Sequence, residues 1–109
     1  MIKILLIEDN PGDARLIQEY LSDLKDFKYT ISTAERLQKG IDILENEFID
    51  VVLLDLNLPD SEGLTGVQQV FSVAPNIPVI VLTGLNDETT AINAVKMGAQ
   101  DYLVKDKVE

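Results

Sequence analysis

The sequence of 109 residues contains neither cysteine nor histidine, and these two absences exclude whole classes of chemistry. Without cysteine there is no disulfide, thiolate nucleophile, iron–sulfur cluster or cysteine-bound zinc. Without histidine the chain lacks the most common general base and the Ser-His-Asp arrangement. A metal bound here must have oxygen ligands, which favours Mg²⁺, Mn²⁺ or Ca²⁺.

Positive charge and long apolar runs are also scarce. Nine lysine and arginine residues face nineteen aspartate and glutamate residues, which gives a formal net charge of −10. A surface this acidic repels nucleic acids and anionic membranes, so we expect direct binding to neither. The longest apolar runs are too short to span a bilayer, and the early first strand leaves no room for a signal peptide. We therefore expect one cytoplasmic domain.

Five short apolar segments predict five β-strands, at residues 2–7, 29–33, 50–54, 78–82 and 100–104. Three of them are nearly continuous in isoleucine, valine and leucine, which is typical of strands buried on both faces of a parallel sheet.

Between these strands, apolar residues recur at the spacing of amphipathic helices. The four sets are Ile17, Tyr20, Leu21 and Leu24; Ala34, Leu37, Ile41 and Leu44; Leu64, Val67 and Phe71; and Ala91, Ala94, Val95 and Gly98. Asn10 and Pro11 predict the start of the first helix, and Gly98 the end of the fourth. Gly40 and Gly66 lie inside helical patterns, at a cost of about 1 kcal/mol each. The alternation predicts an α/β protein with right-handed crossovers.

Polar side chains follow the predicted strands at their carboxyl ends, where open parallel sheets bind ligands. They are Glu8 and Asp9 after the first strand, Asp55 after the third, Thr83 and Gly84 after the fourth, and Lys105 after the fifth. Each alone is commonly a surface residue. Three carboxylates together, however, repel by roughly 1 kcal/mol per pair in water, and a hard divalent cation offsets that repulsion.

Motifs at these strand ends resemble the receiver domain of two-component response regulators. They are Glu8-Asp9, VVLLDLNLPD at residues 51–60, Thr83-Gly84, and DYLVK at residues 101–105. The resemblance extends to about residue 107. It implies a flavodoxin-like, doubly wound, five-stranded parallel sheet of order 2-1-3-4-5. Right-handed crossovers then place the first helix on one face and the next three on the other.

The resemblance also implies a phosphorylation-dependent switch that phosphorylates itself and slowly dephosphorylates, and is not a turnover enzyme. Asp55 is the implied nucleophile, which accepts a phosphoryl group from a sensor histidine kinase, a phosphotransfer protein or a small phosphodonor. The implied Mg²⁺ ligands, with Mn²⁺ as a second candidate, are Asp9, Asp55 and the backbone carbonyl of Asn57. Glu8 acts mostly through water.

The remaining roles implied by the family concern binding and relay of the phosphoryl group. Thr83 and Lys105 hold phosphoryl oxygens, and Gly84 leaves room for the donor. Tyr102 turns inward as Thr83 moves and relays the change to a surface for a downstream effector domain or protein; a homodimer is left open. The other interpretation of Tyr102 is an amphipathic ring at the end of a buried strand.

The chain departs from the family at Lys105. Asp106 stands where many receivers have proline after a cis bond, and a cis bond before a non-proline costs about 2.5–4 kcal/mol, so we expect a trans bond. The family's fifth helix, which follows this lysine, is missing from the sequence. We therefore expect residues 1–109 to be part of a longer signalling protein. Alone, they should self-associate, exchange segments, or be less stable than a version extended by one amphipathic helix.

Three other protein classes have a related fold or chemistry. A flavin-binding module of the same fold needs a phosphate loop rich in Ser, Thr and Gly, whereas residues 8–13 read EDNPGD. Aspartyl-phosphate phosphohydrolases carry a second Asp two residues after the nucleophile, where this chain has Asn57. The remaining alternative is a non-phosphorylated pseudo-receiver that binds proteins. Such domains usually lack one of the acidic, Thr or Lys positions, and all of them are present here.

Overall fold

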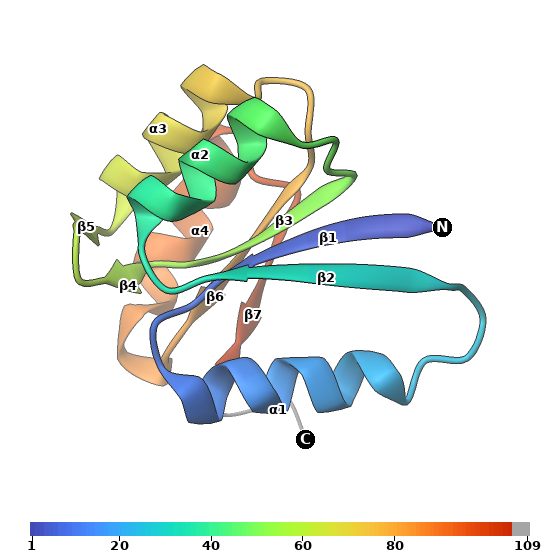
Figure 1. The fold of residues 1–109 in the computed structure, drawn as a ribbon. Coiled ribbons are helices and arrows are strands. Elements are labelled where there is room, and N and C mark those ends of the chain that lie inside the picture. Colours follow the sequence, from blue (N-terminus) through green and yellow to red (C-terminus); the bar gives the residue numbers. More distant parts are fainter. Residues whose placement is uncertain (106–109) are drawn as a thin grey trace.

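The computed structural model describes residues 1–105, and its main feature is a five-stranded parallel sheet flanked by helices (Figure 1). The strands are β1 (Ile2–Ile7), β2 (Tyr29–Ala34), β3 (Val51–Asp55), β6 (Val79–Thr83) and β7 (Asp101–Val104). The helices are α1 (Pro11–Ser22), α2 (Leu37–Asn46), α3 (Leu64–Val73) and α4 (Glu88–Met97). The strand order, β2-β1-β3-β6-β7, confirms the predicted flavodoxin-like topology.

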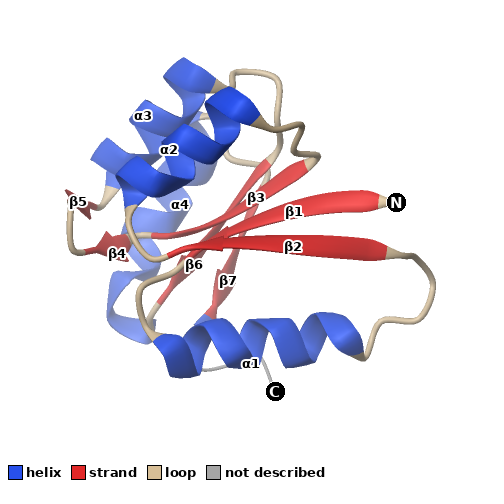
Figure 2. Ribbon diagram, viewed as in Figure 1, coloured by secondary structure: helices blue, strands red, loops and turns tan. Residues whose placement is uncertain are grey.

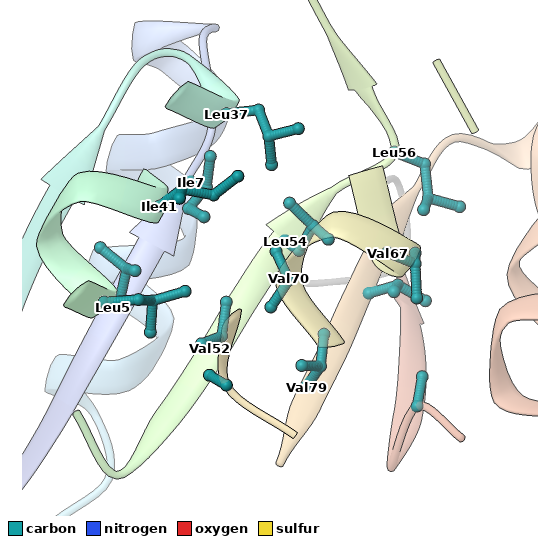
Figure 3. Packing of buried hydrophobic residues seen from close by; sticks show 14 of the residues in the cluster. Leu5, Ile7, Leu37, Ile41, Val52, Leu54, Leu56, Val67, Val70 and Val79 are labelled. Carbon is teal, nitrogen blue, oxygen red and sulfur yellow. The ribbon is translucent and has the colours of Figure 1, made fainter. Parts of the chain in front are cut away.

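Helix α1 covers one face of the sheet, whereas α2, α3 and α4 cover the other (Figure 2). Alternate residues of β1 supply the two cores, because successive strand side chains point to opposite faces. Leu5 and Ile7 lie in the core beneath α2 to α4 (Figure 3). Ile4 and Leu6 pack in a smaller core with Ile17 of α1. The predicted division of one helix against three is confirmed.

Two glycines within helices permit close approaches that a side chain would block. A Cβ atom at Gly40 would collide with the side chain of Ile7, so glycine lets α2 lie directly on β1. A Cβ atom at Gly66 would stand 2.6 Å from the Ser61 Oγ atom. The low helix propensity of glycine is therefore offset by packing at both positions.

The structure corrects several details of the predicted elements. Helix α1 ends at Ser22, and Tyr20 and Leu24 are exposed, so the predicted apolar stripe was too long. Ala34 ends β2 and does not begin the second helix. A short hairpin of β4 (Asn57–Leu58) and β5 (Ser61–Glu62), and a 3₁₀ turn η1 (Leu85–Asp87), were not predicted. The Lys105–Asp106 peptide bond lies outside the described residues.

Candidate functional site

Three carboxylates meet at the carboxyl ends of β1 and β3. These strands are parallel neighbours with Ile7 opposite Leu54, so the residues that follow in each strand lie side by side. Glu8 and Asp55 are each only 3% exposed, whereas Asp9 faces solvent. One carboxylate oxygen from each of the three residues lies within 4.8 Å of the other two. The structure thus brings together the carboxylates that the sequence placed at this edge.

Lys105, just beyond β7, inserts its ammonium group among the carboxylates. Its Nζ atom lies 3.1 Å from Glu8 Oε1 and 3.4 Å from Asp55 Oδ1. A third contact, 2.9 Å to Asp13 Oδ2, is the shortest. Burial lowers the pKa of Lys105, but the hydrogen bond to Asp13 and the charges of Asp55 and Glu8 outweigh it and raise the pKa overall. Lys105 is therefore a fixed positive charge in the cluster.

The pKa of Glu8 is raised because its carboxyl group is buried and lies next to Asp55. Burial is the largest cause, followed by a hydrogen bond with Asp55 and the charge of Asp55, and together they raise the pKa of Glu8 to about 8 despite Lys105. The other carboxylate oxygen, Glu8 Oε2, accepts a hydrogen bond from the Asn10 amide at 3.3 Å. At neutral pH this carboxyl group therefore holds a proton, in a position where a cation could replace it.

Asn57 connects the β3 end of the site to the loop that precedes α4. Its amide donates to Asp55 Oδ1 at 3.2 Å, and its side-chain Nδ2 donates to Asp87 Oδ2 at 3.1 Å. The first bond orients the Asp55 carboxylate, and the second bridges two loops that are 30 residues apart.

Thr83 is the last residue of β6 and Gly84 follows it, just beyond Leu82, which pairs with Asp55 of β3. Thr83 is 2% exposed, and its hydroxyl donates to the Gly84 carbonyl at 3.2 Å. A Cβ atom built on Gly84 meets no other atom within 4 Å, so open space adjoins this backbone.

Tyr102 is half-buried on β7 and packs against the larger core. Its hydroxyl donates to Glu88 Oε2 at 2.7 Å, in the first turn of α4. This hydrogen bond is the main reason why the pKa of Tyr102 is raised. The side chain therefore ties β7 to α4.

Sequence reasoning did not assign Asp13 or Glu88 to this network. The position of Asp13 in the first turn after Asn10-Pro11 was a usable signal, because that turn begins directly beyond Glu8-Asp9. No spacing rule relates Glu88 to Tyr102, since the two lie 14 residues apart on different elements. None of the helices in the described part of the chain combines the length and apolar character needed to cross a membrane.

This arrangement of acidic pair, strand-end aspartate, threonine and lysine is that of a receiver domain. A family model for the response regulator receiver domain matches residues 4–108, and the chain belongs to this family of two-component signalling domains.

Individual relatives support membership of this family. The cell cycle transcriptional regulator CtrA of Caulobacter vibrioides is 31% identical over 95% of this chain and 44% of its own length. The solved structure of the response regulator Rcp1 in its Mn²⁺-bound form has a TM-score of 0.80 and 26% identity, over 95% of this chain and 81% of that one. The phosphorylated cyanobacterial phytochrome response regulator RcpA has a TM-score of 0.73 and 28% identity, over 94% and 79%. The chain spans less than half the length of the curated relatives it matches.

Proposed function

We propose that this receiver domain is a signalling switch that is set by phosphorylation of Asp55. The observation that carries the proposal is one buried strand-end carboxylate that lies beside both a lysine ammonium and two further carboxylates. In the proposed step, an Asp55 oxygen bonds to phosphorus while the P–N bond of a donor phosphohistidine breaks. The imidazole nitrogen leaves with the electron pair and takes up a proton.

The carboxylate cluster also fits a divalent cation, with Mg²⁺ proposed and Mn²⁺ as a second candidate. Its donors are all oxygen atoms, and three of them lie within 4.8 Å of one another, which suits a small hard ion. Asp9, Asp55 and the Asn57 carbonyl would hold the ion directly, and Glu8 through water. Such an ion, when bound, neutralises charge on the transferring phosphoryl group. The Mn²⁺-bound form of Rcp1 supports this assignment.

The chain's own donors are proposed to hold the transferred group. Lys105 Nζ, already 3.4 Å from Asp55 Oδ1, would donate to a phosphoryl oxygen. Thr83 would exchange its present bond to the Gly84 carbonyl for a bond to another phosphoryl oxygen, and the open space at Gly84 would admit the donor. Tyr102 lies on β7, the strand that pairs with β6, and is tied to α4 through Glu88, so movement of Thr83 at the end of β6 would reach that helix.

The proposed partners follow from this chemistry. A sensor histidine kinase or phosphotransfer protein would supply the phosphoryl group in the cytoplasm, and an effector domain or protein would recognise the altered surface. CtrA is a transcriptional regulator by name, which supports an effector of that kind. The domain changes state once per phosphorylation and slowly returns, so it is not a turnover enzyme. The phosphorylated form of RcpA supports the same role.

Mass spectrometry of the intact protein tests this proposal. After incubation with acetyl phosphate and Mg²⁺, we expect the mass of one added phosphoryl group, which alkaline pH removes. Asp55→Ala should abolish the addition. Asp42→Asn, which removes an exposed carboxylate on α2, should leave it intact. If the wild-type protein is not modified by either acetyl phosphate or phosphorylated kinases, it is the non-phosphorylated pseudo-receiver.

A further inference from the structure

Asp13 holds Lys105 from outside the carboxylate cluster. It lies in the first turn of α1, and its Oδ2 atom is 2.9 Å from Lys105 Nζ, closer than either Glu8 or Asp55. The side chains of Asp13 and Lys105 are 35% and 15% exposed, so the pair is partly shielded from water. This ion pair connects α1 to the segment after β7, which come from opposite ends of the chain.

Two features of the first turn of α1 hold Asp13 in this position. Asn10 accepts a hydrogen bond from the Asp13 amide at 3.0 Å, and Pro11 occupies the first helical position. Proline restricts φ there, and the capping bond fixes the rotation of the turn. The Asp13 carboxylate is thus presented to Lys105 by a locally stiff segment.

Asp13 differs from the other two carboxyl groups around Lys105 because it has no further role in the proposed site. Glu8 and Asp55 both belong to the group of three carboxylates that could hold a cation, and Asp55 is the proposed phosphoryl acceptor. A cation and a phosphoryl group would therefore draw on the same two carboxyl groups that now hold Lys105. Asp13 is outside that group. A lysine ammonium has three N–H donors, so the contact with Asp13 leaves two for other acceptors.

We propose that Asp13 is a positioning residue for phosphoryl transfer, which anchors the Lys105 ammonium beside Asp55 while the cluster is occupied. The proposal rests on the function proposed above. With the ammonium already in place, a phosphoryl oxygen on Asp55 gains a preorganised donor and need not order a free lysine side chain. Without Asp13, the ion pairs that remain to Lys105 within residues 1–105 are those with Glu8 and Asp55. We expect Asp13→Asn to slow phosphorylation by roughly three- to tenfold, in the range of a coupled ion pair.

A double-mutant cycle separates positioning of Lys105 from a general effect of charge or folding. The rate of phosphorylation by acetyl phosphate at saturating Mg²⁺ would be measured for wild type, Asp13→Asn, Lys105→Gln and the double variant. If Asp13 acts through Lys105, its removal slows the wild type but leaves the Lys105→Gln protein unchanged. Glu19→Gln removes the same charge from an exposed site on the same helix, and should match the wild type. An equal slowing in both backgrounds, or in Glu19→Gln, overturns the proposal.

A second measurement reports the contact without any phosphodonor. In protein carrying ¹⁵N-labelled lysine, an ammonium group held by three carboxyl groups exchanges its protons slowly enough for NMR detection. We expect the Lys105 Nζ signal in wild type and Glu19→Gln, and its broadening or loss in Asp13→Asn. If wild type shows this signal but is not phosphorylated, the proposed function fails while the contact stands. If Asp13→Asn leaves both the signal and the rate unchanged, the positioning role is wrong.

Discussion

Glu8 shows most clearly that a residue suited to the proposed site can be unfavourable for folding. Its carboxyl group is buried beside Asp55 with one lysine to offset the charge, and its pKa rises from 4.5 to about 8. The folded protein therefore binds a proton that the unfolded chain releases between these two pH values. An apolar residue at this buried position after β1 would cost less folding free energy than an acid. The presence of Glu8 is therefore explained by its place in the carboxylate cluster and not by stability.

This pKa shift predicts how stability depends on pH. Because the folded pKa is the higher one, the contribution of protonated Glu8 is complete below about pH 4.5 and is lost as pH rises through about 8. We expect the free energy of unfolding of the metal-free wild type to fall over this range relative to that of Glu8→Gln, which cannot ionise. Urea unfolding with a chelator present measures both curves. Glu45→Gln, on α2, serves as the control, and parallel curves for wild type and Glu8→Gln would contradict the assigned pKa.

The site was predictable where its residues sit at strand ends, and less so where they sit on helices. Glu8, Asp9, Asp55 and Lys105 meet because the carboxyl ends of parallel strands share one edge of the sheet. Asp13 reaches the same point only because the first turn of α1 has a particular rotation, which a linear sequence does not display. The sequence therefore predicts which strand-end residues meet at the site, whereas the contribution of a helix residue depends on the rotation of its helix.

Helix α2 depends on a cap that comes from another element. Its own N-cap residue, Arg36, makes no capping bond with its side chain. Instead Asp60, in the turn between β4 and β5, accepts hydrogen bonds from the amides of Leu37 at 2.8 Å and Gln38 at 3.0 Å. These backbone bonds outweigh desolvation and lower the pKa of Asp60. The hairpin after the proposed phosphoryl acceptor is thus secured to α2.

Removal of this cap should destabilise the protein measurably. Asp60→Ala leaves two amides at the start of α2 without their acceptor, and we expect a loss of about 1 kcal/mol in the free energy of unfolding. Because the pKa of Asp60 is lowered in the folded state, the difference should shrink as pH falls through that pKa and the carboxylate is protonated. Urea unfolding of wild type and Asp60→Ala at several pH values measures this difference in the free energy of unfolding. Asp42→Ala, on the exposed side of the same helix, should change stability by less than about 0.5 kcal/mol. Equal losses in the two variants would contradict the capping role.

The main strands and helices could be read from hydrophobic periodicity because each buries a row of side chains. The hairpin β4–β5 could not, since its strands contain two residues each and show no period. The low helix propensity of glycine argued against helices at Gly40 and Gly66. Only the close approach to Ile7 and Ser61 explains why glycine occupies these positions. Local propensity and tertiary packing conflict at these two positions, and packing determines the outcome.

The net charge of −10 acts on the whole molecule as well as on the site. Any added cation screens the mutual repulsion of nineteen acidic residues, so salt alone should raise stability. A cation held by Glu8, Asp9 and Asp55 would add a separate contribution, because the unfolded chain does not assemble these three carboxylates. The two effects can be separated only at matched ionic strength.

Thermal unfolding with Mg²⁺ and with NaCl of equal ionic strength therefore tests the metal site. At a Mg²⁺ concentration of 100 Kd, binding to the folded state alone contributes about 2.7 kcal/mol, which raises Tm by on the order of 10 °C in a domain of this size. We expect NaCl to give a smaller rise. Asp55→Asn should melt higher than wild type without metal, since it removes one negative charge from the cluster of Glu8, Asp9 and Asp55, and should respond to Mg²⁺ and NaCl almost alike. Equal responses of wild type to the two salts would show that screening accounts for the whole effect, and the cluster would then not be a Mg²⁺ site.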